Sequence, residues 1–187
     1  MGRIVCIGGS TGAPAALLEL LGRLPDPYPA PILVALHMPA AMSESYARSI
    51  DRKTPFRAQV AENDLLPRPG RVYVGPGGFH VGLGRTGRVV VTPRPQDTLF
   101  KPSIDVLFYT AARAAGSRVT AVVLTGLSVG KDGVRGALAV KEGRGAVLVI
   151  DEPGNRFLGM PKNVIDAGAA TVVAPLPVLA QKLGRLG

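Results

Sequence analysis

Continuous apolar runs alternate along this chain with segments of helical periodicity. The runs lack the two-residue alternation of half-buried strands, so each predicts a strand buried on both faces. They cover residues 3–9, 30–37, 118–126 and 145–151, and a shorter run covers 171–175. Helical spacing of apolar residues follows in segments 13–24, 40–51, 103–116, 133–143, 160–168 and 175–186. This order predicts an α/β fold with a doubly wound, mostly parallel sheet and helices on both faces.

Residues 71–93 depart from this alternation. Short β-like runs are separated here by the turn sequences GPGG and GRTG, which are typical of antiparallel hairpins. We therefore expect a hairpin insertion within the parallel fold. The chain shows no repeat, linker or low-complexity block, and its 187 residues favour one domain over 1–187.

The composition excludes several classes of protein. Hydrophobic residues make up 47% and charged residues 19%, which is typical of a globular chain rather than a disordered one. No apolar run approaches the roughly 18 residues of a membrane span, and the run after Arg3 is too short for a signal peptide. The single cysteine, Cys6, cannot form an internal disulfide and is predicted to be a small core residue. We expect a cytoplasmic protein without membrane insertion.

The formal net charge of +9 indicates either a solvated basic surface or an acidic partner. Nucleic acid is not the expected partner, because the arginines and lysines are scattered, with no basic run and no interleaved aromatic residues. If the charge serves binding, it favours docking on an acidic protein.

In parallel sheets, functional sites lie at the carboxyl ends of the strands. Ser10 follows the first predicted strand, His37 follows the second, and the loop LTGLSVGKDG (124–133) follows the third. The turn at Ser10 could present a nucleophile or cradle a phosphate. A dinucleotide site is disfavoured, since Ile7 occupies the first glycine position of the fingerprint and His37 stands where a ribose-binding acid would be expected. A nucleotide-binding α/β protein remains one alternative.

The hydrolase interpretation explains more of the pattern. A serine on a sharp strand-to-helix turn is exposed, and the N–H groups of the following helix can stabilise an oxyanion. Such a serine needs an imidazole and an orienting carboxylate. The sequence contains two histidines, and His37 ends the strand expected beside that of Ser10.

Three aspartates could orient His37. Asp105 lies within a helical pattern and is predicted to be solvated or to cap a helix, while Asp151 follows a later strand. Asp132 lies in a glycine-flanked loop at the same sheet edge as Ser10 and is favoured. The order Ser, His, Asp differs from the Ser, Asp, His of α/β-hydrolases and indicates another family.

Six sequence blocks resemble, in order, those of the CheB-type protein-glutamate methylesterase catalytic domain. They are IGGSTGAPAAL, ALHMP, VYVGPGGFH, KPSIDVLFYTAA, VVLTGLSVGKDG and GMPKNVIDAGAA. The resemblance implies hydrolysis of γ-glutamyl methyl esters on bacterial chemoreceptors with release of methanol, and in many members deamidation of receptor glutamines. The expected partners are methylated chemoreceptor cytoplasmic domains, and no metal or organic cofactor is expected.

The same resemblance assigns the site residues. It implies Ser10 as nucleophile, His37 as general base and Asp132 as the orienting carboxylate. The remaining expected positions are the oxyanion region around the backbone of Thr11 and Leu127, and a cleft formed by Gly9, Gly12, Met38 and His80.

Two features depart from the family pattern. Leu127 replaces a usual methionine, and Ser128 and Val129 look inserted, so that Asp132 arrives two residues late. A displaced Asp132 would favour the alternative of a catalytically weakened module that binds receptors without efficient turnover. Many members also carry an N-terminal receiver domain; here the first predicted strand begins at Ile4, and no receiver domain is expected.

Overall fold

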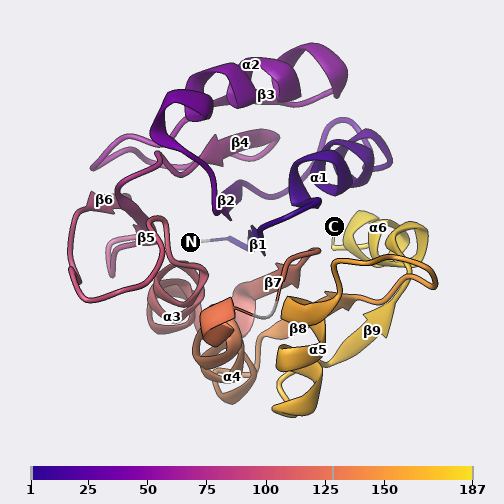
Figure 1. Cartoon of the computed structure of the whole chain (residues 1–187). Coiled ribbons are helices and arrows are strands. Elements are labelled where there is room, and N and C mark those ends of the chain that lie inside the picture. The colour runs from indigo at the N-terminus through magenta and orange to yellow at the C-terminus, as the bar shows by residue number, and fades with distance from the viewer. Residues whose placement is uncertain (1, 128, 187) are drawn as a thin grey trace.

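The protein is a twisted parallel sheet between two layers of helices (Figure 1). The computed structural model describes residues 2–127 and 129–186. Seven strands pair in the order β3-β4-β2-β1-β7-β8-β9, and every one of these pairs is parallel. In chain order the strands are β1 Ile4–Gly9, β2 Ile32–Leu36, β3 Arg57–Val60, β4 Arg71–Val74, β7 Val119–Val123, β8 Ala146–Ile150 and β9 Val172–Ala174.

Six α-helices are described, and they divide between the two faces of the sheet. One face carries α1 (Ala13–Gly22), α2 (Ser43–Lys53) and α6 (Leu176–Gly184); the other carries α3 (Ile104–Ala115), α4 (Val134–Glu142) and α5 (Gly159–Asp166). Short 3₁₀ turns lie at Ala40–Met42, Gly116–Arg118 and Val129–Lys131. Figure 1 shows this division, and it confirms the predicted doubly wound α/β class.

The central strands are buried on both faces, as their continuous apolar runs predict. In β1, Val5 and Ile7 pack into the core under α1 and α6, whereas Ile4 and Cys6 pack into the core under α3 and α4. Cys6 is fully buried, and burial raises the pKa of its thiol. This confirms Cys6 as a small core residue. No helix among the described residues is long and apolar enough to cross a membrane.

The segment 71–93 is only partly the hairpin that its turns suggest. β5 (His80–Leu83) and β6 (Val89–Thr92) form an antiparallel pair beside the main sheet. β4, however, joins the main sheet in parallel with β2 and β3, so its prediction as a hairpin strand is wrong. β3 was not predicted at all, because this four-residue edge strand is half-buried or exposed throughout and produces no apolar run.

One close contact sets the position of α3 against the sheet. A Cβ atom on Gly8 would lie 2.3 Å from Cγ2 of Ile104, so only glycine allows the first residue of α3 to rest on β1. The N-terminus of α3 is thereby held near the carboxyl end of the central strand.

Candidate active site

Three strand ends meet where the sequence predicts a site. Because β1 lies between β2 and β7, the residues that follow these strands are neighbours. Backbone hydrogen bonds join them: the N–H of Ser10 donates to the carbonyl of Thr125 at 2.8 Å, and that of His37 donates to the carbonyl of Gly9 at 3.1 Å. Ser10 is half-buried in the turn between β1 and α1. Within the described part of the chain, its hydroxyl makes no hydrogen bond to protein.

His37 and Asp132 are in direct contact. Nε2 of His37 lies 2.8 Å from Oδ2 of Asp132, and both side chains are nearly buried. A ring that donates Nε2–H to the carboxylate has Nδ1 as its free, proton-accepting nitrogen. The carboxylate therefore fixes which nitrogen of His37 can act as a base.

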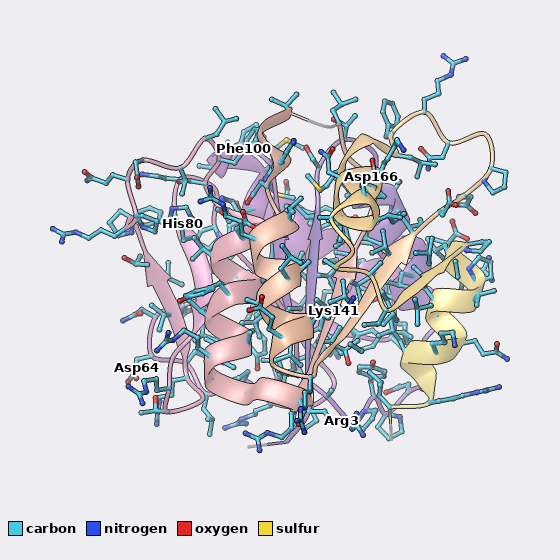
Figure 2. All side chains as sticks on the ribbon, turned by 90° about the horizontal axis from the view of Figure 1, so that it is seen from below. Arg3, Asp64, His80, Phe100, Lys141 and Asp166 are labelled. Atoms are coloured by element: carbon cyan, nitrogen blue, oxygen red, sulfur yellow. The ribbon has the colours of Figure 1, made fainter. Side chains whose placement is uncertain are left out.

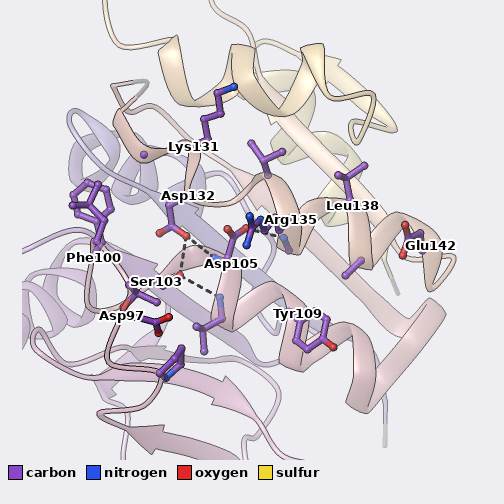
Figure 3. A pocket seen from close by; sticks show the side chains of 18 residues that line it. Asp97, Phe100, Ser103, Asp105, Tyr109, Lys131, Asp132, Arg135, Leu138 and Glu142 are labelled. Atoms are coloured by element: carbon purple, nitrogen blue, oxygen red, sulfur yellow. Dashed lines mark hydrogen bonds between the residues drawn. The ribbon is translucent and has the colours of Figure 1, made fainter.

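Asp132 is held by four further donors. Its Oδ1 accepts hydrogen bonds from the Ser103 hydroxyl at 2.8 Å and from the N–H groups of Asp105 and Gly133 at 2.9 and 3.1 Å. Its Oδ2 also accepts from the N–H of Ile104 at 2.8 Å. Figure 3 shows Asp132 facing Ser103 and Asp105 at the start of α3.

The electrostatics of this contact favour a charged carboxylate. Burial alone raises the pKa of Asp132, but hydrogen bonds from His37, from the backbone of Asp105 and Ile104, and from Ser103 outweigh it. The net effect is a pKa below the ordinary aspartate value. The N-terminus of α3 is the positive end of the helix dipole and acts in the same direction. Asp132 is thus ionised at neutral pH.

The loop before Asp132 turns through left-handed backbone. Gly130, Lys131 and Gly133 have φ angles of 70°, 51° and 95°. These turns bring Asp132 back to His37, so the late arrival of the aspartate does not displace its carboxylate. Of the two residues that look inserted, Ser128 lies outside the described residues, and Val129 is exposed.

The CheB methylesterase family model matches residues 5–183. The chain belongs to this family. A protein-glutamate methylesterase/protein-glutamine glutaminase of Myxococcus xanthus is 42% identical over 185 residues, covering 97% of this chain and 53% of that protein. One of Geobacter sulfurreducens is 38% identical over 98% of this chain and 51% of that protein. The chain thus spans about half the length of these curated relatives.

A solved structure of the family has the same fold. The Thermotoga maritima CheB methylesterase catalytic domain aligns with a TM-score of 0.92 at 37% sequence identity, covering 100% of both chains. The seven-stranded sheet and the flanking helices of this CheB family member therefore match a known catalytic domain along its whole length.

The expected oxyanion positions of this CheB-type domain lie in the turns that flank Ser10. Thr11 is exposed and lies two residues before α1. Leu127 is half-exposed and follows Gly126, whose N–H donates to the carbonyl of Phe157 at 2.7 Å. Among the described residues, the N–H groups of Thr11 and Leu127 donate to no protein acceptor. Two free amides beside the serine are what an oxyanion site requires.

The expected cleft residues are not all at the surface. Met38 is half-buried after His37, Gly9 is buried at the end of β1, and Gly12 is exposed as the first residue before α1. His80, by contrast, is fully buried. It is therefore a buried side chain and cannot line a cleft, which corrects the expectation drawn from the resemblance.

His80 supports the site from below. Its Nδ1 accepts the N–H of Ser103 at 3.1 Å, while Nε2 lies 2.9 Å from the carbonyl of Pro95. Burial lowers the pKa of His80. A neutral ring with Nε2–H and a free Nδ1 satisfies both contacts, and it holds the residue that hydrogen-bonds Asp132.

Sequence reasoning missed Ser103 and Phe100. Ser103 is the N-cap of α3, since its hydroxyl also accepts the N–H of Val106 at 3.3 Å. A serine directly before the first apolar residue of a helical pattern could have signalled this cap. The Phe100 ring stacks on His37 with centroids 3.9 Å apart. No sequence signal points to that contact.

A groove of about 960 Å³ extends outward from Asp132 between α3, α4 and residues 95–103 (Figure 3). Asp132 and Phe100 line it together with residues of α3 and α4, among them Tyr109 and Glu142. Among the described residues, no group of three or more histidine, cysteine or acidic side chains could hold a metal ion.

Proposed function

We propose that this domain is a serine esterase that hydrolyses glutamate γ-methyl esters on chemoreceptors and releases methanol. The observation that carries the proposal is the 2.8 Å contact between His37 and the anchored carboxylate of Asp132, at the strand end beside Ser10. The curated relatives bear the name protein-glutamate methylesterase/protein-glutamine glutaminase, which supports the same reaction.

The proposed reaction assigns one role to each group. Ser10 Oγ attacks the γ-carbonyl carbon as its proton passes to Nδ1 of His37, the nitrogen turned away from Asp132. The serine hydroxyl closes on Nδ1 when substrate is seated, since catalytic hydrogen bonds often tighten only in the complex. The N–H groups of Thr11 and Leu127 bind the oxyanion.

Collapse of the tetrahedral intermediate breaks the bond to the methoxy group. The imidazolium returns its proton to that oxygen, methanol leaves, and Ser10 is left as an acyl ester. Water then attacks the ester with His37 as base, which releases the glutamate carboxylate and restores the serine. Asp132 remains charged throughout and stabilises the imidazolium.

The same chemistry extends to deamidation. Attack on the side-chain amide of a glutamine gives the same acyl-enzyme, with ammonia instead of methanol as the leaving group. The second half of the relatives' name supports this activity.

Within this proposal, residues 1–187 form one catalytic domain. It acts in the cytoplasm on methylated chemoreceptor cytoplasmic domains and needs no metal or organic cofactor. The binding-only alternative required a displaced Asp132; no observation favours it, because the carboxylate hydrogen-bonds His37.

Methanol release from methylated receptor membranes tests the function. The wild-type domain should release methanol, and Ser10→Ala should lower the rate by roughly 10³-fold or more, as expected for side chains that act as a unit. The fold should survive, because Ser10 is a half-buried turn residue. Receptor binding by the wild-type domain without methanol release would instead support a binding-only module.

The net charge of +9 suggests that receptor docking has an electrostatic component. If so, the KM for receptor substrate should rise with salt as the Debye length shortens to about 8 Å near physiological ionic strength. A KM that stays constant from low to high salt would show that the basic surface serves solubility alone.

A further inference from the structure

Phe100 covers one face of the His37 ring. The two ring centroids lie 3.9 Å apart, and the planes are inclined by 13°. Phe100 belongs to the connection between β6 and α3, and in Figure 2 it lies at the opposite end of the molecule from Arg3, which precedes β1. The stack therefore lies at the carboxyl edge of the sheet, where Ser10 also lies.

The hydrogen bond to Asp132 does not by itself fix the imidazole. A ring held only through Nε2 can still tilt about that bond, and the direction of Nδ1 would change with it. A parallel aromatic ring at contact distance removes this freedom, because any tilt would drive one ring into the other. The hydrogen bond and the stack together thus determine the plane of His37.

One short segment makes the first contact and supports the second. Phe100 supplies the ring, and three and four residues later Ser103 and Ile104 supply hydrogen bonds to the carboxylate of Asp132. The segment therefore places the imidazole and its orienting acid together.

Core packing does not account for Phe100. The residue is only half-buried, its neighbour Leu99 is 69% exposed, and Phe100 also lines the open groove between α3 and α4. Its near-parallel stack on His37 is the specific contact that the ring makes.

We propose that Phe100 is a positioning residue for His37: it holds the imidazole plane that directs Nδ1 toward Ser10, and its face stabilises the positive charge that His37 gains in the reaction. An aromatic face attracts a neighbouring cation, more strongly when water is excluded. The catalytic part of the proposal rests on the proposed esterase function.

Kinetics of two variants and a matched control test this role. Phe100→Leu keeps an apolar cover but lacks the aromatic face, and should lower kcat for methanol release by roughly 5- to 30-fold with KM unchanged. Phe100→Tyr should retain kcat within about threefold, because it keeps the ring. Tyr109→Leu removes another half-exposed aromatic ring from the same groove, at a position without contact to His37, and should leave kcat unchanged.

Nitrogen-15 and proton NMR of the imidazole rings gives a readout independent of activity. The chain has two histidines, so the spectrum contains two sets of ring signals, which His80→Gln assigns. His37 should show a protonated Nε2, a free Nδ1 and ring protons shifted upfield by the stacked ring. In Phe100→Leu the upfield shift should disappear. The ring signals should also broaden, because the imidazole can then tilt about its hydrogen bond to Asp132, which still keeps Nε2 protonated.

The outcomes separate this inference from the proposed function. A wild-type domain that releases no methanol defeats the esterase function, and the NMR comparison still decides whether Phe100 holds the imidazole. Unchanged His37 signals in Phe100→Leu would overturn the inference. A wild-type kcat in Phe100→Leu, or an equal loss in Phe100→Tyr, would also overturn it.

Discussion

At the scale of single residues, Asp132 is the most constrained group of the site. Its two carboxylate oxygens accept five hydrogen bonds, from two side chains and three backbone N–H groups. Removing one partner from such a buried charged network is costly, because the remaining donors lose their acceptor. The carboxylate therefore holds one nitrogen of His37 and also anchors the loop that carries it.

Asp132→Asn should lower kcat by up to about 10⁴-fold. The asparagine side chain has an NH₂ group in place of one of the two accepting oxygens. If the NH₂ faces His37, it favours the wrong imidazole tautomer; if it faces the start of α3, it meets N–H donors there without an acceptor. The thermal midpoint should fall as well. Steady-state kinetics and thermal unfolding of the same preparation measure the two effects.

Asp105→Asn is the matched control. Asp105 is the neighbouring carboxylate, it accepts the N–H of Gly136 at 2.7 Å, and an asparagine oxygen can keep that bond. This variant should retain kcat within about threefold. If Asp105→Asn were the inactive variant and Asp132→Asn the active one, the assignment of the orienting carboxylate would be reversed.

At the scale of elements, the return of the chain to Asp132 depends on backbone that ordinary residues avoid. Gly133 precedes α4 with φ of 95°, and its N–H donates to Asp132. A Cβ atom there would lie 3.2 Å from Cγ2 of Ile104, the residue that also hydrogen-bonds Asp132. A side chain at position 133 would therefore strain the backbone, crowd Ile104 and disturb the contacts of the Asp132 carboxylate.

Gly133→Ala should destabilise the fold by about 1–3 kcal/mol through backbone strain. It should also lower kcat by roughly 10- to 100-fold, because pushing Ile104 away shifts the carboxylate that orients His37. Gly168→Ala, with φ of 70° and open space around the new Cβ, imposes the strain without the contact and should leave kcat unchanged. Equal kcat losses in the two variants would rule out the proposed displacement.

The elements that can be predicted from the sequence are those whose burial produces a recognisable run or spacing of apolar residues along the chain. β1, β2, β7 and β8 are continuous apolar runs because helices cover both faces of the sheet. The ends of three of these runs indicated Ser10, His37 and the loop of Asp132 as candidate site residues. β3 is a short, half-exposed edge strand, and β4 resembles a hairpin strand until its partner β2 is known. These two assignments depend on tertiary neighbours.

The supporting residues were not predictable for the same reason. Ser103 and Phe100 reach the site only because α3 packs closely on β1 at Gly8, a contact between distant parts of the chain. His80 was expected in the cleft from its place in the motif, but the same packing buries it under Ser103. Local pattern identified which strand ends carry the candidate site residues, whereas the groups that contact them come from tertiary packing.

At the scale of the whole molecule, the hydrogen bonds to Asp132 make the free energy of unfolding depend on pH. A carboxyl whose pKa is lowered on folding stabilises the native state above its ordinary value of 3.8, and that contribution is lost as pH falls through the lowered value. Asp105 acts in the opposite direction, because burial raises its pKa and acidification relieves the cost of its charge. Asp105 is present both in the wild type and in Asp132→Asn, so a comparison of these two proteins reports on Asp132.

The stability difference between wild type and Asp132→Asn should therefore be largest at neutral pH and shrink below about pH 4. Denaturant unfolding at a series of pH values measures it. A difference that stays constant down to pH 2 would show that the charge of Asp132 contributes nothing to folding.

The hydrogen bonds to Asp132 should also change the rate at which amide protons at the start of α3 exchange with water. The first N–H groups of a helix have no partner within the helix, so their amide protons ordinarily exchange quickly with water. Here the amides of Ile104 and Asp105 are both bound to a nearly buried carboxylate from another loop. Their exchange should be slow only while Asp132 is in place, so deuterium uptake at these two positions should report assembly of the site without any substrate.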